Sequence, residues 1–205
     1  VTYRFGERVG DMEMRNLALL GMRGWKPENP VSQLLTGNVN GGNLTHSLRE
    51  LCWVPADAQP EETPRALTTW LPDLQLLVAR ESSYAGEGLV LAAKGGHNDE
   101  NHNHNDVGQF IIMLDGQPGI IDIGVETYTR QTFSDRRYEI WCIRASGHNV
   151  PLVNGIEQTA GRERRATGVR LTDSGAVTEL SMHLQEAYPA EATLTALRRD
   201  IALDR

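Results

Sequence analysis

The sequence predicts a mainly β protein, in which an antiparallel β-sandwich over residues 74–205 follows a helical segment over residues 1–54 and a linker over residues 55–73. Three observations support this division. Apolar residues at helical spacing are confined to the first segment, a proline-rich acidic stretch follows it, and beyond that stretch short apolar runs alternate with turn residues. Regular short strands with turn signals and no helices between them are typical of an antiparallel β-sandwich.

Residues 11–22 (DMEMRNLALLGM) carry a helical pattern, with Asp11 as the expected N-cap. The apolar residues that recur there at helical spacing are Met14, Leu17, Ala18 and Met22. Shorter helices are expected over residues 30–35 and 44–51, on either side of the glycine-rich loop 38–43. Such short helices enclose little core, so we expect the segment to be the end of a larger helical domain whose earlier part is missing.

The linker is predicted from composition. Residues 55–64 (PADAQPEETP) hold three prolines and three acidic residues without hydrophobic periodicity.

The expected strands are short apolar runs bounded by Gly, Asp and Asn. They cover residues 74–81, 88–95, 107–116, 118–124, 138–143, 167–171, 176–184 and 193–203. Asp115-Gly116, between two of these runs, is a strong signal for a tight β-hairpin.

Charge and apolar content exclude some functions. The net charge of −7 argues against a nucleic-acid partner, and no apolar run is long enough to span a membrane. The segment from Arg130 to Arg165 is nevertheless basic, with seven arginines against four acidic residues. Arginine binds carboxylate and sulfate groups well, so this segment indicates an acidic ligand or, alternatively, a solvated face with local ion pairs. Cys52 and Cys142 show no metal-site spacing and are either free thiols or one disulfide.

Residues 95–106 (GGHNDENHNHND) concentrate side chains that bind metals and transfer protons. If this stretch is a strand, His102 and His104 project from the same face. Asp122 lies between two isoleucines, where a carboxylate is costly to bury unless it is paired or ligated, and His148 follows in a predicted turn. Two histidines and an aspartate are ligands of the zinc type. The alternative is a hydrogen-bonded polar loop, in which the neighbouring polar residues Glu100, Asn101, Asn103 and Asn105 cap the backbone.

Several spaced motifs resemble one family. KGGHNDENHNHNDVGQF, GIIDIGVETYT, RYEIWCI and SGHNVPLVNGIEQ occur in the order found in the C-terminal β-sandwich domain of heparinase II/III-like polysaccharide lyases. The resemblance covers roughly residues 70–205, and the first 55 residues look like the end of that family's (α/α) helical toroid.

The resemblance implies roles for five residues. His104, Asp122 and His148 match zinc ligands, and His102 matches a histidine of the catalytic cleft that assists proton transfer or carboxylate neutralisation. Tyr138 matches a position that contacts substrate in some members. The family's principal catalytic tyrosine, with its Asn and His partners, lies in the toroid, and nothing in the first 54 residues matches them. The chain on its own is therefore expected to be inactive, and the resemblance gives His97 no role.

The family's reaction is β-elimination on a uronic acid within a polysaccharide of the heparan or alginate type. A base removes the C5 proton, the C4 glycosidic oxygen leaves, and an unsaturated sugar remains. The resemblance also implies a periplasmic or secreted location, and dimers occur in the family. The first alternative is a non-catalytic, zinc-stabilised β-sandwich that binds acidic glycans. A second is a zinc hydrolase with Glu100 as its general base.

Overall fold

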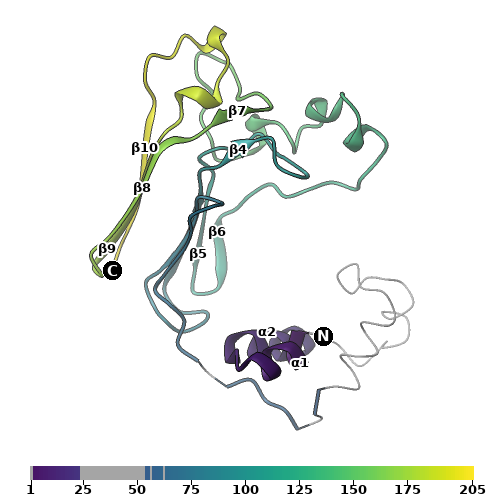
Figure 1. Cartoon of the computed structure of the whole chain (residues 1–205), viewed down its shortest axis with the longest axis vertical. Helices are drawn as coiled ribbons and strands as arrows, with labels where there is room; N and C mark the ends of the chain where they lie inside the picture. Colours follow the sequence, from purple (N-terminus) through teal and green to yellow (C-terminus); the bar gives the residue numbers. More distant parts are fainter. Residues whose placement is uncertain (1, 24–53, 56, 62) are drawn as a thin grey trace. The chain divides into compact units, whose positions relative to one another are not determined.

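The computed structural model describes residues 2–23, 54–55, 57–61 and 63–205 (Figure 1). The chain divides into two compact units, one ending at Arg65 and the other running from Ala66 to Arg205. Within the described parts of the chain, no helix has the length and apolar character that crossing a membrane requires.

The first unit contains two helices, α1 (Thr2–Val9) and α2 (Met12–Arg23). Asp11 caps α2 as predicted, because its carboxylate accepts a hydrogen bond of 2.9 Å from the backbone N–H of Met14. Helix α1 was not predicted from the sequence. It packs closely on α2 through Gly6, where a side chain would meet the backbone of Arg15 at 2.8 Å. The helices expected over residues 30–35 and 44–51, and the loop between them, lie outside the described residues.

The second unit begins with a large antiparallel sheet of the order β1-β2-β3-β5-β6. Its strands are β1 (Thr68–Leu71), β2 (Leu76–Arg80), β3 (Leu89–Lys94), β5 (Phe110–Leu114) and β6 (Gln117–Ile120). Strand β1 lies inside the range predicted as linker, so the sheet begins before residue 74. The pairing of Trp70 with Leu77 draws this short segment onto the edge of the sheet.

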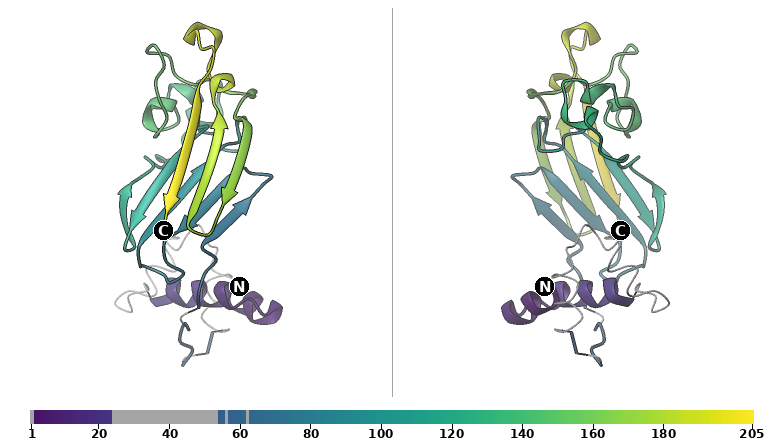
Figure 2. Two further views of the ribbon diagram at one scale, coloured as in Figure 1. Left: turned by 90° about the vertical axis from the view of Figure 1, so that its left-hand side faces the viewer. Right: turned by 90° about the vertical axis from the view of Figure 1, so that its right-hand side faces the viewer.

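A second antiparallel sheet faces the first, as Figures 1 and 2 show. It has the order β10-β9-β8, from β8 (Thr167–Asp173), β9 (Val177–His183) and β10 (Arg198–Asp204). The core lies between the sheets, with Leu77 and Leu91 of the first packed in one cluster with Leu180 and Met182 of the second. Period-2 burial along β2 and β9 places these side chains on the inner faces. The predicted antiparallel β-sandwich with a short helical segment is confirmed.

The hairpin between β5 and β6 turns at Asp115-Gly116, as predicted. Both residues have left-handed backbones, with φ of 49° and 73°. This is the conformation that a two-residue type I′ turn requires.

The predicted strand over residues 138–143 is wrong. The backbone there forms turns and a 3₁₀ helix, η2 (Arg137–Glu139), between η1 (Gln131–Phe133) and η3 (Ala145–Gly147). The apolar alternation that suggested a strand is real, because Ile140 and Cys142 are buried while Trp141 between them is 62% exposed. These residues form a second small core instead of pairing with a strand. Cys142 is a buried free thiol, and Cys52 lies outside the described residues.

A two-stranded ribbon and two 3₁₀ helices complete one end of the sandwich (Figure 1). A two-stranded ribbon joins β4 (His97–Asn98) to β7 (Gly161–Arg165). The 3₁₀ helices η4 (Gln185–Ala187) and η5 (Ala190–Ala192) precede β10.

Candidate functional site

The histidine-rich stretch folds as a turn after β4. The N–H of Asn103 donates to the Glu100 carbonyl at 3.1 Å, and the Glu100 N–H donates to Oδ1 of Asn103 at 3.3 Å. Asparagine side chains compete with strand pairing by offering such local hydrogen bonds. The expectation that His102 and His104 share a face of one strand is therefore wrong, since neither residue lies on a strand.

His102 has a strained backbone and an aromatic environment. Its φ of 59° lies in the left-handed region, which residues with a side chain seldom occupy. The imidazole stacks on the ring of Tyr128 at 5.6 Å and 16°, and meets the ring of Phe133 almost at right angles at 6.0 Å. A strained residue held by its surroundings is a common feature of functional sites.

His104, Asp122 and His148 come together from three segments of the chain. The His104 and His148 rings lie 5.1 Å apart, and Nδ1 of His148 lies 2.6 Å from Oδ1 of Asp122. Burial lowers the pKa of His104, and the neighbouring His148 lowers it further. Both effects favour the neutral imidazole, which is the form that binds metals.

The His148 side chain is fully buried, whereas that of Asp122 is 37% exposed. Asp122 is thus less buried than its isoleucine neighbours suggested. Among the described residues, Nε2 of His148 is one of the few buried polar atoms with no hydrogen-bond partner. Such an atom needs a partner, and a metal ion would provide one.

The carboxylate of Asp122 faces the other nitrogen of the same ring, a pairing that orients metal-bound histidines. In the described part of the chain, no group of three or more His, Cys, Asp or Glu side chains is already arranged to hold a metal ion. Two histidines and an aspartate are nevertheless a donor set of the zinc type. Asp122 and the unpartnered Nε2 lie on opposite sides of the His148 ring, so Asp122 cannot ligate an ion at Nε2 while it remains bonded to Nδ1.

Gln109, which the sequence did not single out, holds this group in place. Its side-chain nitrogen donates to Oδ1 of Asp122 at 2.9 Å, and its oxygen accepts from the N–H of Asn149 at 2.7 Å. Asn149 in turn donates to the carbonyls of Phe110 and Ile121. The segments that carry Asp122 and His148 are therefore both attached to the start of β5. The only sequence signal for this role was that Gln109 interrupts an apolar run.

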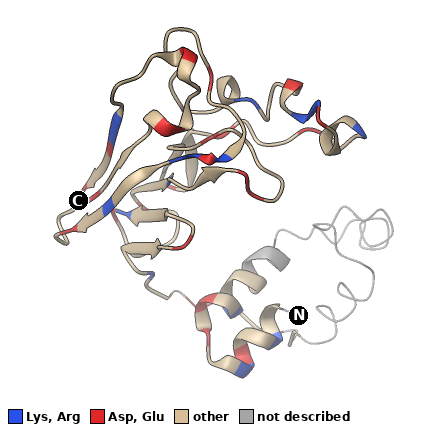
Figure 3. Cartoon of the chain, turned by 45° about the horizontal axis from the view of Figure 1, so that its top comes forward, with Lys and Arg blue, Asp and Glu red and all other residues tan. Residues whose placement is uncertain are grey.

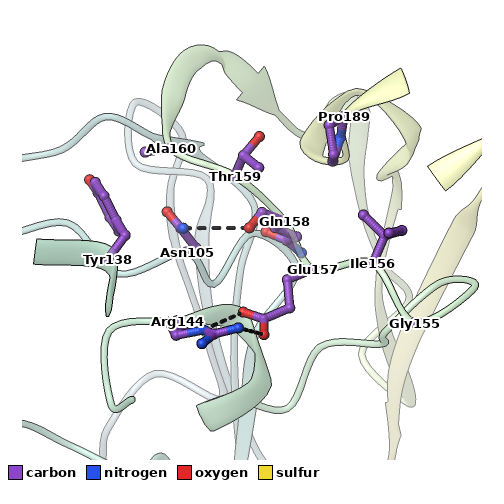
Figure 4. Close-up of a pocket in the computed structure, with 10 residues that line it drawn as sticks. All are labelled: Asn105, Tyr138, Arg144, Gly155, Ile156, Glu157, Gln158, Thr159, Ala160 and Pro189. Carbon is purple, nitrogen blue, oxygen red and sulfur yellow. Dashed lines mark hydrogen bonds and ion pairs between the residues drawn. The ribbon is translucent and has the colours of Figure 1, made fainter. Parts of the chain in front are cut away.

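Tyr138 lines an open pocket of about 500 Å³ (Figure 4). Its hydroxyl accepts a hydrogen bond of 3.3 Å from the side chain of Asn103, the residue between the two histidines of the turn. Arg144 and Glu157 form an ion pair of 2.5 Å at the pocket wall. The side chain of Asn105, also at the wall, donates to the carbonyl of Gln158.

Gln158 is a buried hub that the sequence did not reveal. Its Oε1 accepts hydrogen bonds from Asn98 and from the N–H of Val107, and its Nε2 donates to the carbonyl of Val107. Asn98, which is fully buried, also accepts from the N–H of Asp106. Several side-chain amides of the histidine-rich stretch thus hold loops in place by hydrogen bonds, as expected if this stretch is a hydrogen-bonded polar loop.

Glu100 is engaged elsewhere. Its carboxylate lies 3.0 Å from Nζ of Lys94, which also contacts Asp106 at 3.3 Å. Burial by itself would lower the pKa of Lys94, but Asp106 and Glu100 together raise it above its ordinary value. A carboxylate paired in this way is poorly suited to act as the general base of a hydrolase.

His97 lines a separate polar pocket of about 720 Å³, together with Asp99, Glu100, Arg162 and Arg165. Its Nδ1 accepts a hydrogen bond from the N–H of Asp99 at 3.1 Å.

Basic and acidic positions alternate along the ribbon of the second unit (Figure 3, blue and red). The arginines of the basic segment are of two kinds. Ion pairs to carboxylates engage Arg136, Arg144, Arg164 and Arg165. Arg137 instead donates to the carbonyls of Asn103 and Thr132, which joins the histidine turn to η1. The interpretation as a solvated, ion-paired face thus describes part of this segment, while Arg137 keeps a charge that no carboxylate offsets among the described residues.

The fold is similar to that of heparinase III, known from a crystal structure. The match has a TM-score of 0.50 at 18% sequence identity and covers 97% of this chain. At that identity the likeness is one of fold. The chain corresponds to 26% of the length of the heparinase III chain. No protein-family model matches the sequence, and no curated protein matches it either.

Proposed function

We propose that this chain supplies the β-sandwich part of a polysaccharide lyase that cleaves uronic-acid-containing polysaccharide by β-elimination. The observation that carries the proposal is the gathering of His104, Asp122 and His148 at the turn that presents His102, within a fold like that of heparinase III. The name of that protein indicates that it acts on heparin. An acidic polymer also suits the uncompensated charge of Arg137.

The reaction makes specific demands on the site. The C5 proton of a uronate is weakly acidic, and the adjacent carboxylate opposes further negative charge. Groups that neutralise the carboxylate and the enolate formed from it therefore lower the barrier. A base must take the C5 proton, which leaves the electrons of that bond in the enolate. As the C4–O bond breaks, those electrons form the C4–C5 double bond, and an acid protonates the departing oxygen.

His102 is suited to a proton-transfer or neutralising role in this scheme. Stacking on Tyr128 covers a face of the imidazole, but both ring nitrogens lie in the ring plane and remain able to donate or accept. Tyr138 would contact substrate from the pocket wall, with its hydroxyl oriented by Asn103. The remaining catalytic groups would come from the helical part of the protein, so we expect the isolated chain to be inactive.

Zinc is part of the proposal, with His104, Asp122 and His148 as the residues that would hold it. When bound, it would tie the histidine turn to the loops that carry Asp122 and His148 and so add to the folding free energy. The neutral state favoured for His104 supports this assignment, and so does the 2.6 Å approach of Nδ1 of His148 to Oδ1 of Asp122, since both atoms can ligate one ion. A lyase for such polymers would act in the periplasm or outside the cell.

The test is an elimination assay on the protein that carries this chain, with heparan-type and alginate-type polymers as substrates. The expected result is a rise in the ultraviolet absorbance of the C4–C5 double bond. His102→Ala should reduce the rate by roughly 100-fold or more, the usual contribution of a group that transfers a proton. If only saturated sugars were released, the reaction would be hydrolysis and the proposed elimination would be wrong.

The second candidate function is a zinc-stabilised module that binds acidic glycans without catalysis. This candidate is favoured because the side-chain amides near the histidines, and many of the arginines, already hydrogen-bond or pair within the protein and so serve its structure. In that case His102→Ala would leave glycan binding unchanged, and no polymer would yield unsaturated product.

A further inference from the structure

The rings of His102, Tyr128 and Phe133 form a cluster at the surface of the second unit, here called the aromatic cluster. Tyr128 is stacked on His102, and Phe133 is perpendicular to both, with its ring centre 5.4 Å from that of Tyr128. Despite these contacts, Tyr128 is 47% exposed and Phe133 is 67% exposed. Rings that pack on one another while remaining open to water form a surface available to a ligand.

The aromatic cluster lies next to the small core of Ile140, Cys142 and Ile143, since Tyr128 lines a small cavity together with Cys142 and Ile143. Tyr128 and Phe133 nevertheless keep about half or more of their surface exposed. Their exposure calls for another explanation, and their contact with His102 suggests one.

Hydrogen bonds fix the backbone around the aromatic cluster before any ligand binds. Arg137 donates to the carbonyl of Thr132, next to Phe133, and to the carbonyl of Asn103, next to His102. Thr132 is itself buried and its hydroxyl accepts from the N–H of Thr129, next to Tyr128. Each of the three rings is therefore adjacent in sequence to a residue whose backbone or side chain belongs to this one hydrogen-bonded group. A preorganised surface loses little entropy when a ligand binds.

Charged groups of both signs lie near the aromatic cluster, since Glu126 lines a small cavity with Tyr128 and Arg137 donates to the carbonyl of Thr132, next to Phe133. The arginines of this region can bind an anionic ligand. Arg137 bonds only to carbonyl oxygens in the described residues, and Arg130, the residue before η1, makes no ion pair there. Both guanidinium groups remain free of carboxylates, in contrast to Arg136, which pairs with Glu139 at 2.8 Å. An acidic ligand could therefore approach the rings without displacing a carboxylate from either arginine.

We propose that Tyr128 and Phe133 form a stacking subsite for one pyranose ring of the acidic polymer, next to His102. The inference rests on the proposed function and deepens it. The C–H groups on a face of a pyranose ring are apolar and weakly positive, so they pack on the negative face of an aromatic ring. The hydroxyl and carboxylate groups at the edge of the sugar would point to water. The subsite places a sugar of the chain beside the imidazole.

The experiment measures binding of alginate-type and heparan-type hexuronate oligosaccharides by calorimetry, using the protein that carries this chain. Tyr128→Ala and Phe133→Ala should each raise Kd by about 3- to 10-fold, as expected for the loss of an aromatic contact. Tyr128→Phe keeps the ring and should bind like the wild type. Tyr84→Ala is the matched control, because Tyr84 is 42% exposed in the loop between β2 and β3 and should not affect binding.

A measurement on the unmodified protein guards against loss of folding in the variants. Titration with the same oligosaccharides should shift the NMR signals of the Tyr128 and Phe133 ring protons and leave those of Tyr84 in place. Equal affinities for wild type, Tyr128→Ala and Phe133→Ala, or shifts at Tyr84 alone, would overturn the subsite. So would a self-association that the Tyr128→Ala substitution abolishes while sugar binding is unchanged.

The outcomes separate the subsite from the reaction. If unsaturated product forms but these substitutions change neither Kd nor KM, the subsite is wrong and the lyase stands. If the substitutions weaken binding but no polymer gives unsaturated product, the subsite stands and the elimination is wrong.

Discussion

At the scale of single residues, polar side chains determine the shape of the site more than apolar ones do. Gln109, Gln158 and Arg137 each bond to segments that are distant in the sequence. Each of them satisfies backbone groups that would otherwise be left unpaired in partly buried loops. The histidines of the turn depend on this scaffold for their positions.

Arg137→Ala should destabilise the second unit by about 1–3 kcal/mol, because the carbonyls of Asn103 and Thr132 lose their charged donor. Chemical denaturation followed by circular dichroism measures the change. Arg136→Ala is the control, since that side chain is 72% exposed and its loss should change the stability far less than the loss of Arg137 does. Equal effects of the two substitutions would show that Arg137 does not join the turn to η1.

The Arg144–Glu157 pair predicts a pH dependence. Burial alone would raise the pKa of Glu157, but hydrogen bonds from Arg144 and Ser146 lower it below its ordinary value of 4.5. A carboxyl group whose pKa is depressed in the folded state stabilises the protein above its unfolded pKa, and this contribution is lost as the pH falls. We expect Glu157→Gln to flatten the stability profile below about pH 5, by no more than about 1 kcal/mol because the Arg144 side chain is 47% exposed and solvent screens the pair. Denaturant unfolding midpoints measured from neutral to acidic pH test this effect. Parallel curves of stability against pH for the variant and the wild type would contradict it.

At the scale of secondary-structure elements, local sequence signals succeeded where backbone conformation follows from a few neighbours. The Asp115-Gly116 turn and the Asp11 cap are set by adjacent residues, and both were predicted. The predicted strand over residues 138–143 failed because alternating burial arises equally from a turn-rich segment that packs on its own small core. Periodicity reports which side chains are buried and leaves open which backbone hydrogen bonds form.

Gly116→Ala should destabilise the β5–β6 hairpin by about 1–2 kcal/mol, since an L-residue is strained at its φ of 73°. The added methyl group would also press on the backbone of Gly86 at 3.3 Å. Thermal unfolding of the variant tests this. Gly119→Ala, in β6 where the backbone is not left-handed and the nearest atom is at 3.4 Å, serves as the control and should change stability little. A larger loss for Gly119→Ala than for Gly116→Ala would refute the assigned turn.

At the scale of the whole second unit, the sandwich provides a rigid end on which loops from distant segments converge. The segments of Asp122 and His148 are attached to the start of β5 through Gln109 and Asn149. Arg199 of β10 adds hydrogen bonds to the carbonyls of Gly108 and Asn149, which links the second sheet to the same point. The two sheets and the candidate site are therefore expected to lose structure together.

The proposed zinc gives a prediction at this scale. Protein purified without chelator should contain one zinc per chain by elemental analysis, and a chelator should lower the Tm by roughly 5 °C or more. His104→Ala should lower the Tm more than His102→Ala does, because only the former removes a proposed ligand. Absence of stoichiometric metal, together with a Tm insensitive to chelator, would remove the zinc from the proposal and leave His102 to be tested by the elimination assay.

The sequence by itself determined the class of fold, the hairpin turn and the residues at which to look for chemistry. These features follow from local backbone preferences, from the alternation of apolar side chains and from the types of side chain in short motifs. Only the tertiary structure decided that His102 and His104 belong to a turn and contact different partners, with Tyr128 and Phe133 beside one and His148 beside the other. Those contacts join segments that are far apart in the chain, and their geometry depends on how the sheets and loops pack, which no local pattern encodes.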